Sequence, residues 1–210
     1  MSNKKLIIIG ASGHGKVCAD IALKMNKWDE IVFLDDNPQV KSVLGLKVIG
    51  NTSDTIKYLE NCDFIVGIGN NDVRKKLFED LEKSGANIPN LIHPSAIIGK
   101  DVVINNGTVI MPGAIINCST TIGKGCIINT GATIDHDSVI GDFVHISPGT
   151  HLAGSVKIGN NSWIGIGSVV SNNITICCRC IIGAGGVVVN DIEESGVYVG
   201  IPVKLKKKFL

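Results

Sequence analysis

The chain has 210 residues, of which 44% are hydrophobic and 19% are charged, and its formal net charge is +1. This near-neutral balance gives no electrostatic basis for binding nucleic acid, so no nucleic-acid partner is expected. No apolar run approaches the roughly 20 residues needed to cross a bilayer, so no membrane span is expected. The seven cysteines are odd in number and scattered, and no signal peptide is evident. Both features favour reduced thiols in a cytoplasmic protein.

Residues 1–90 alternate short apolar runs with helix-like stretches, a pattern that predicts a parallel α/β domain. The sequence predicts strands at residues 6–9, 31–34 and 64–69, and helices at residues 16–27, 54–61 and 72–84. The first strand runs into the glycine-rich segment Gly10–Gly15, and the second ends at Asp35 and Asp36.

A glycine-rich turn between a strand and a helix lets backbone N–H groups approach a phosphate. Carboxylates at the end of the next strand can accept hydrogen bonds from a ribose or a base. The spacing here is G-x-x-G-x-G, which departs from the dinucleotide pattern. These residues therefore predict a mononucleotide half-site, with a tight structural turn as the alternative.

From Ile92 to Val188 every sixth residue is aliphatic, and no insertion breaks the step. Fourteen of these 17 positions are isoleucine. A six-residue unit is one short strand and one turn, and three units close an 18-residue coil whose aliphatic side chains stack inward. Residues 91–210 are therefore predicted to form a parallel β-helix with a C-terminal tail. A six-residue repeat that continues without a break over this length argues strongly against a β-sandwich, in which strands show ordinary two-residue alternation.

Seven segments spread over the chain carry a family resemblance: residues 10–15, 33–36, 68–71, 90–93, 134–137, 145–148 and 199–202. Together they resemble the PglD/NeuD-type sugar acyltransferases of the hexapeptide-repeat family, in which a small α/β domain that holds a UDP-sugar precedes the β-helix. The resemblance implies a left-handed β-helix and a homotrimer with active sites between protomers. It also implies acetyl-CoA as co-substrate, no metal, and N-acetylation of a UDP-4-amino-4,6-dideoxy sugar, as in a bacillosamine-type pathway.

His136 lies between Asp135 and Asp137. One histidine of near-neutral pKa can remove and later return a proton, and an adjacent carboxylate can fix its tautomer and raise its basicity. In the resembling family the equivalent histidine is the catalytic base, supported by the acid that follows it, usually Glu; here that acid is the shorter Asp137. We expect direct acetyl transfer without an acyl-enzyme. His136 and His145 are nine residues apart, half an 18-residue coil, so they can share a site only across a subunit interface.

The other expected contacts divide between the two substrates. Those expected to bind the nucleotide sugar are Gly10, Ser12, Gly13, His14, Gly15, Asp35, Asp36, Gly69, Asn70, Asn129 and Asp135. Those expected to bind acetyl-CoA are His145, Gly154, Gly165, Ile166, Gly183, Ala184 and Lys204. Among them the Gly154 N–H is the candidate donor to the thioester oxygen.

Three alternatives stay open from the sequence. A transferase acting on a sialic-acid-type sugar, or on a GDP- or dTDP-linked amino sugar, fits the same residues. A γ-type carbonic anhydrase shares the β-helix and holds zinc with three histidines, although His145 and His151 are expected on different faces. A non-catalytic scaffold would leave His136 between two acids unexplained. Cys177, Cys178 and Cys180 are clustered, but no second Cys/His group with ligand spacing accompanies them, so a metal site there is not favoured.

Overall fold

The structure is a computed structural model that describes residues 4–209. The chain divides into two compact units, Met1–Pro94 and Ser95–Leu210, where the sequence placed the boundary after residue 90. No helix within residues 4–209 is long and apolar enough to cross a membrane.

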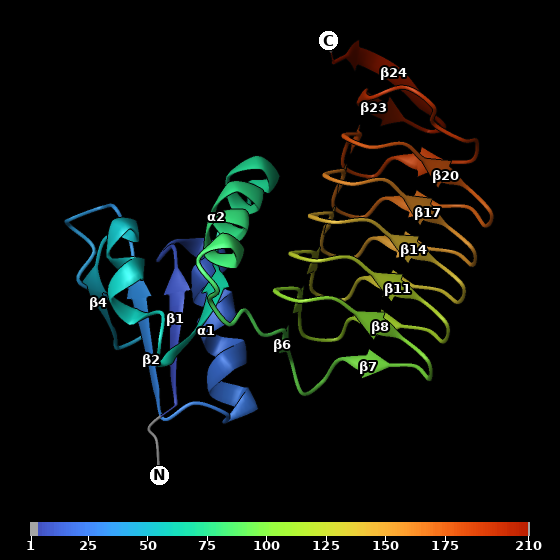
Figure 1. Ribbon diagram of the computed structural model, residues 1–210. Coiled ribbons are helices and arrows are strands. Elements are labelled where there is room, and N and C mark those ends of the chain that lie inside the picture. Colours follow the sequence, from blue (N-terminus) through green and yellow to red (C-terminus); the bar gives the residue numbers. More distant parts are fainter. Residues whose placement is uncertain (1–3, 210) are drawn as a thin grey trace. The chain divides into compact units, whose positions relative to one another are not determined.

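The N-terminal unit is built on a sheet with the strand order β3-β4-β2-β1-β5 (Figure 1). Its strands are β1 (Lys5–Ile9), β2 (Glu30–Leu34), β3 (Ser42–Val43), β4 (Leu46–Gly50) and β5 (Cys62–Val66). All neighbours pair in parallel except β3 and β4. The helices are α1 (Gly13–Met25), the 3₁₀ helix η1 (Thr52–Tyr58) and α2 (Asn71–Lys83), and β6 (Leu91–Ile92) follows. Strand β1 and the neighbouring edge strand β5 are almost wholly buried, as expected for apolar runs in a parallel sheet.

Two features of this unit differ from the sequence expectation. The helix expected at residues 54–61 is a 3₁₀ helix that begins at Thr52. Its start is fixed by Asn51, whose side chain accepts from the Ser53 N–H, and by Asp54, whose carboxylate accepts from the Asn51 N–H, both at 3.0 Å. The hairpin β3–β4 was not expected at all. Its turn places Leu44 at φ 53° and Gly45 at φ 77°.

The second unit is a stack of two-residue strands that recur every six residues (Figure 1). They are β7 (Ile97–Ile98), β8 (Val103–Ile104), β9 (Val109–Ile110), β10 (Ile115–Ile116), β11 (Thr121–Ile122), β12 (Ile127–Ile128), β13 (Thr133–Ile134), β14 (Val139–Ile140), β15 (His145–Ile146), β16 (His151–Leu152), β17 (Lys157–Ile158), β18 (Trp163–Ile164), β19 (Val169–Val170), β20 (Thr175–Ile176), β21 (Ile181–Ile182) and β22 (Val187–Val188). Each pairs in parallel with the strand 18 residues away, which confirms the predicted coil.

The strands form three sheets, one on each face of the coil. The first contains β7, β10, β13, β16, β19 and β22, and the second contains β8, β11, β14, β17 and β20. The third includes β9, β12, β15, β18 and β21, followed by β23 (Gly196–Gly200) and β24 (Val203–Lys208). β24 pairs antiparallel with β23, so the expected C-terminal tail is an ordered hairpin.

Two columns of inward-pointing side chains form the core of the β-helix. From Ile110 to Val188 every sixth residue is at most 3% exposed, whereas Ile98 in the first coil is 36% exposed because no coil precedes it. The residues two positions earlier are mostly small and also buried. Their hydroxyls bond to backbone carbonyls, as between Thr150 Oγ1 and the Gly165 oxygen at 3.0 Å. Buried hydroxyls in the core thereby find hydrogen-bond partners.

One corner residue in each repeat has a left-handed backbone. Every sixth residue from Asp101 to Gly185 has φ between 56° and 69°, and about half of these residues are glycine. A non-glycine residue tolerates this conformation at some cost, least for Asn and Asp. Asp137 occupies one such corner, where its N–H donates to the Cys118 carbonyl at 3.2 Å. The corner that carries His136 is therefore fixed by backbone bonding between coils.

Candidate functional site

The glycine-rich loop follows β1 at the carboxyl edge of the sheet. A Cβ on Gly10 would lie 2.5 Å from Ile68 Cδ1, and one on Gly15 would lie 1.9 Å from the Gly10 oxygen. These two glycines are therefore required by the close approach of β1, α1 and the segment after β5. By contrast, Gly13 and Gly69 face open space, since a Cβ on either would meet no atom within 4 Å. The backbone is thus accessible to a ligand at Gly13, in this loop, and at Gly69, in the segment after β5.

The two acids after β2 hold neighbouring loops in place. Asp35 accepts from the N–H of Ala11 at 2.6 Å and of Asn37 at 2.8 Å. Asp36 accepts from the N–H and the hydroxyl of Thr52, at 2.8 and 2.7 Å. Both carboxylates therefore organise the site as well as lining it.

A hollow of about 510 Å³ lies at this edge. It is lined by Gly10, Asp35, Asp36, Thr52, Ile68, Val73, Lys76 and Leu77. Ligands of open α/β sheets bind at the carboxyl ends of strands, where the chain order reverses, and here the order reverses at β1. The sequence had pointed to the first three lining residues, but Thr52 and the α2 residues were missed.

His14 is partly buried in the glycine-rich loop, with Nε2 3.6 Å from Cys18 Sγ. Burial, and next the positive charge of Arg74, lower the pKa of His14 to about 4, so the ring is neutral at pH 7.

Arg74 is only 2% exposed and donates to the Gly69 carbonyl at 2.9 Å and to Asn71 Oδ1 at 2.7 Å. Asn70 caps α2 by accepting from the Val73 N–H at 3.0 Å. Arg74 therefore fixes the loop that joins β5 to α2. The sequence did not predict this role, because Arg74 is one of several charged residues in α2.

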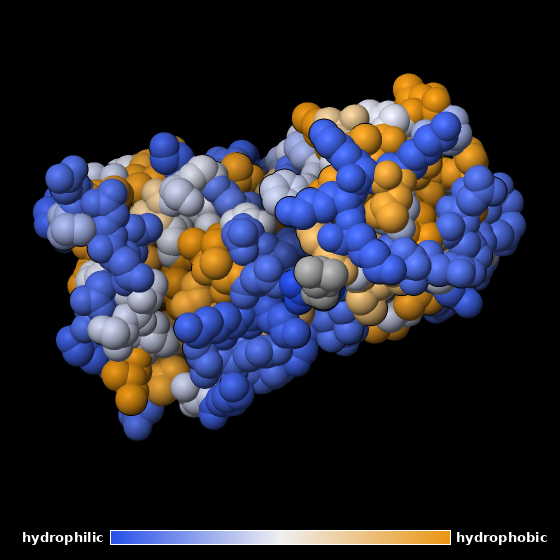
Figure 2. Space-filling view, turned by 90° about the horizontal axis from the view of Figure 1, so that it is seen from above, coloured by the Kyte–Doolittle hydropathy of each residue, from blue (hydrophilic) through white to orange (hydrophobic). Residues whose placement is uncertain are grey.

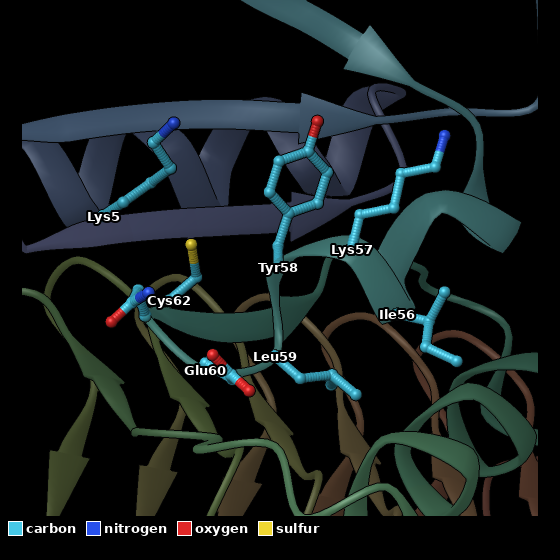
Figure 3. A pocket seen from close by; sticks show the side chains of 8 residues that line it. Lys5, Ile56, Lys57, Tyr58, Leu59, Glu60 and Cys62 are labelled. Atoms are coloured by element: carbon cyan, nitrogen blue, oxygen red, sulfur yellow. The ribbon is translucent and has the colours of Figure 1, made fainter.

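Another hollow, of about 440 Å³, opens beside the first residues of β1 and β5 (Figure 3). Lys5, Tyr58 and Cys62 line it together with other residues of η1 and of the segment that follows η1. It therefore lies at the amino edge of the sheet, away from the glycine-rich loop. We assign it no part in nucleotide binding.

The strongest chemical feature of the β-helix is the corner after β13. His136 Nδ1 lies 2.7 Å from Asp137 Oδ2, and this hydrogen bond, followed by the charge of Asp135, raises the pKa of His136. Asp135 Oδ1 accepts from the His136 N–H at 2.9 Å and from Asn117 Nδ2 at 2.7 Å, and these bonds lower the pKa of Asp135. His136 is thus held by two carboxylates on a rigid corner, with more than half of its side-chain surface exposed.

Gly154 follows His136 by one complete coil. A Cβ at Gly154 would lie 2.7 Å from His136 Nε2 and Cε1, so the ring lies directly over the Gly154 backbone. The backbone of Gly154 does not have a positive φ, so glycine is required here for space alone. The structure therefore brings together the expected base and the residue expected to bind the thioester oxygen.

A second group of polar side chains lies on the sheet that contains β15 and β18. Asn129 Nδ2 is 3.1 Å from His145 Nε2, and the His145 ring stacks on Trp163 with centroids 5.1 Å apart. Trp163 Nε1 donates to Ser147 Oγ at 2.7 Å. Ser147 lies in the segment 145–148 that carries the family resemblance, but Trp163 had not been singled out in the sequence, because an aromatic residue on a strand is most often simply packed.

The residues expected to bind acetyl-CoA fall into two places within one chain. Gly165 and Gly183 follow β18 and β21, next to Ile166 and Ala184, on the side of the coil that carries His145. Gly154 lies at the corner of His136, half a coil away. Lys204 is in β24, where it pairs with Val199. Within one chain, therefore, the expected base and most of the residues expected to bind acetyl-CoA lie on different sides of the coil.

Residues 4–209 contain no group of three or more His, Cys, Asp or Glu side chains that could hold a metal ion. His145 and His151 lie in different sheets, on β15 and β16.

Comparison with known proteins gives consistent matches. The model of the PglD N-terminal domain family matches residues 5–81. The acetyltransferase domain of PglB from Neisseria gonorrhoeae FA1090 is 41% identical, with a TM-score of 0.93, over 96% of this chain and 98% of that one. The chain belongs to the PglD-type sugar N-acetyltransferases.

Other members of the PglD-type family show the range of ligands. A structure of the same Neisseria domain contains acetyl coenzyme A. PerB from Caulobacter crescentus, solved with CoA and GDP-perosamine, is 36% identical with a TM-score of 0.90 over 96% of each chain. UDP-N-acetylbacillosamine N-acetyltransferase from Bacillus subtilis (strain 168) is 37% identical over 112 residues, about half the length of each protein. These matches confirm the predicted family, its left-handed β-helix and acetyl-CoA as the co-substrate of the family.

Proposed function

We propose that this protein transfers the acetyl group of acetyl-CoA to the 4-amino group of a UDP-4-amino-4,6-dideoxy sugar, with His136 as general base. The observation that carries the proposal is the corner at which His136 is bonded to Asp137 and lies over Gly154. The similarity to the Bacillus enzyme supports the bacillosamine-type substrate.

The geometry supports a direct transfer. Asp137 accepts from Nδ1 of His136, which leaves Nε2 unprotonated to take the proton of the amine as it attacks the thioester. The Gly154 N–H is proposed to stabilise the oxyanion that forms. His136 then returns the proton to the leaving thiolate. No acyl-enzyme is proposed, because the amine is itself a competent nucleophile once neutral.

The nucleotide end of the substrate is proposed to bind at the carboxyl edge of the N-terminal sheet. The accessible backbone at Gly13, with neutral His14 beside it, supports contact with a phosphate or with the sugar. Asp36 and Asn70 are proposed to contact the nucleoside. Thr52 Oγ1 lies 2.9 Å from Asp36 Oδ2 and so holds this carboxylate at the edge of the hollow.

We propose a homotrimer whose active sites lie between protomers. His136 lies at the corner between two sheets, and His145 lies on the third sheet, opposite that corner. The exposure of more than half of the His136 side chain in one chain supports a second copy completing the site. The seven free thiols support the cytoplasm as the compartment.

A GDP-linked amino sugar is the second candidate substrate. It is favoured by the match to PerB, which extends over 96% of both chains and was solved with GDP-perosamine. The same corner chemistry serves either nucleotide, because the reacting amine and the nucleotide are at opposite ends of the substrate.

A panel of UDP-, GDP- and dTDP-linked amino sugars, assayed with acetyl-CoA by thiol release, tests the proposal. Mild base, which cleaves an acetyl ester but not an acetamide, followed by mass spectrometry of the product, distinguishes N- from O-acetylation. We expect the UDP-4-amino sugar to give the highest kcat/KM, and His136→Ala to lower kcat by about 10²–10⁴-fold. Near-normal turnover of His136→Ala would exclude His136 as the base. Preference for a GDP-linked sugar would select the second candidate.

A further inference from the structure

Three cysteines follow β20 in the C-terminal coils, and two of their sulfurs are in contact. Cys180 fills a buried inward position, where its N–H donates to Ser162 Oγ one coil earlier at 3.1 Å. Cys177 is partly exposed, and its Sγ lies 3.4 Å from Cys180 Sγ. Cys178 between them is exposed. The pair thus joins one accessible sulfur to one shielded sulfur.

We propose that Cys177 and Cys180 are a redox modification site that closes to an intramolecular disulfide when the protein meets a hydroperoxide. The Cys177 thiolate attacks the terminal peroxide oxygen, the O–O bond breaks, and Cys177 sulfenic acid forms with release of water or an alcohol. Cys180 then attacks the Cys177 sulfur and expels hydroxide, which combines with the Cys180 proton to give a second water. Two thiols lose two electrons and two protons, and the peroxide accepts them.

Because their surroundings differ, the sulfurs of Cys177 and Cys180 are proposed to take different parts in the reaction. A peroxide reaches Cys177 because it is partly exposed, and susceptibility to oxidation follows access. Burial, and next the hydrogen bond with Cys177, raise the pKa of Cys180 to about 12, so this thiol keeps its proton while Cys177 is reduced. The Cys180 sulfur lies 3.4 Å from the Cys177 sulfur, so it is placed to attack that sulfur once Cys177 is oxidised.

The closed pair has a structural consequence at the base of the C-terminal hairpin. Cys180 Sγ is 3.6 Å from the Glu194 carbonyl, to which the Tyr198 hydroxyl donates at 2.8 Å. Disulfide formation removes the Cys180 S–H from this group, so the segment that leads into β23 loses one of its donors. The proposal does not depend on the acetyl-transfer chemistry.

Arg179 lies between the two cysteines, and this makes the test direct. Purified protein is treated with hydrogen peroxide, its remaining thiols are alkylated under denaturing conditions, and trypsin cleaves after Arg179. We expect the peptide that ends at Arg179 and the peptide that begins at Cys180 to stay joined, and to separate after dithiothreitol. A non-reducing gel should show a monomer-sized chain.

Three variants make the assignment specific. Cys178→Ser, the matched control, should keep the linked peptides, whereas Cys177→Ser and Cys180→Ser should each lose them. Circular dichroism establishes that each variant is folded. The proposal is overturned if wild-type protein gives only sulfinic acids or disulfides between chains, or if the link survives in Cys177→Ser, which would place the bond at Cys178.

Discussion

The hydrogen bond between His136 and Asp137 sets both the tautomer and the pKa of the imidazole. Because the pKa of His136 is raised, its neutral, basic form appears at higher pH than for an ordinary histidine. The acidic limb of the kcat/KM profile should therefore lie above the ordinary histidine pKa of about 6.5. Asp137→Asn keeps an acceptor but removes the charge. It should move this limb to lower pH and reduce kcat less than His136→Ala does.

Profiles of kcat/KM against pH for the wild type and Asp137→Asn, recorded with the same acceptor, test this assignment. An acidic limb that stays in place in Asp137→Asn would show that His136 is not the titrating base, or that Asp137 does not control it.

Gly154 gives an independent test of the same corner. A methyl group at this position would meet His136 Nε2 and Cε1 at 2.7 Å, so the ring must move in Gly154→Ala. A displacement of about 1 Å in a reacting group can cost about 10²-fold in rate, and a loss of that order in kcat is expected. The melting temperature should change little, because Gly154 does not have the positive φ that strains alanine and the His136 ring is more than half exposed.

A double-mutant cycle separates this effect from a general disturbance. In the His136→Ala background, Gly154→Ala should cost almost nothing further, because the displaced ring is already absent. An equal loss in both backgrounds would mean that Gly154 acts independently of His136, for example through its own N–H.

At the scale of the element, the stability of the coil depends on how completely each inward residue is covered. Ile146 is 0% exposed in a central coil, whereas Ile98, at the same position of a six-residue unit in the first coil, is 36% exposed. Ile146→Ala should lower the free energy of unfolding by about 2–5 kcal/mol, because it creates a cavity in packed surroundings. Ile98→Ala should cost clearly less.

Urea denaturation at one fixed protein concentration measures both variants. The same concentration is needed because assembly contributes to the stability of an oligomer. Equal losses for Ile146→Ala and Ile98→Ala would contradict a core built from stacked columns.

The β-helix could be predicted from the sequence because its period is local: each six-residue unit repeats its inward residue and its corner. The hairpin β3–β4 could not, because its turn begins with Leu44 at φ 53° rather than with Asn, Asp or Gly. The β23–β24 hairpin was hidden by its lysines, which suggest a solvated tail. Its outer surface mixes exposed apolar side chains with lysines, including Ile201 at 78% and Leu205 at 45%. Figure 2, which views the molecule from above, shows hydrophobic and hydrophilic residues mixed on the exposed surface.

The candidate site was only partly predictable from the sequence, because only some of its residues belong to short local motifs. His136 with its flanking acids, and the glycine-rich loop, are contiguous in sequence and carry their chemistry in short motifs. Thr52 acts through a tertiary contact with Asp36, and Arg74 bonds the Gly69 carbonyl five residues earlier, but neither residue belongs to a recognisable motif. The stack of His145 on Trp163 depends on the 18-residue coil, which relates residues too far apart to form a motif.

At the scale of the whole molecule, the separation of His136 from His145 within one chain makes a prediction about mixed assemblies. His136→Ala and His145→Ala should each be weakly active alone. When the two variants are co-expressed, some sites receive an intact His136 from one copy and an intact His145 from the other. If each trimer site draws its two histidines from different chains, roughly a quarter of the sites are restored by random mixing.

Activity of the mixed assembly is compared with that of each variant and with a mixture prepared after purification, which should not exchange subunits quickly. Light scattering on the wild type should give the mass of a trimer. Recovery no greater than the sum of the two variants, or a monomer mass at micromolar concentration, would show that sites are not shared between chains.

The unbroken six-residue step also restricts how the length of such a chain can change. The ring of His136 lies over Gly154 because the two residues are one full turn apart. Insertion of one hexapeptide between them would rotate everything downstream by a third of a turn and carry the glycine to another face. Insertion of a whole 18-residue coil upstream would only lengthen the rod by one strand spacing, roughly 4.8 Å. Gains and losses of sequence in this half of the molecule should therefore be tolerated in complete turns, so the solenoid can evolve in length only by quantised steps.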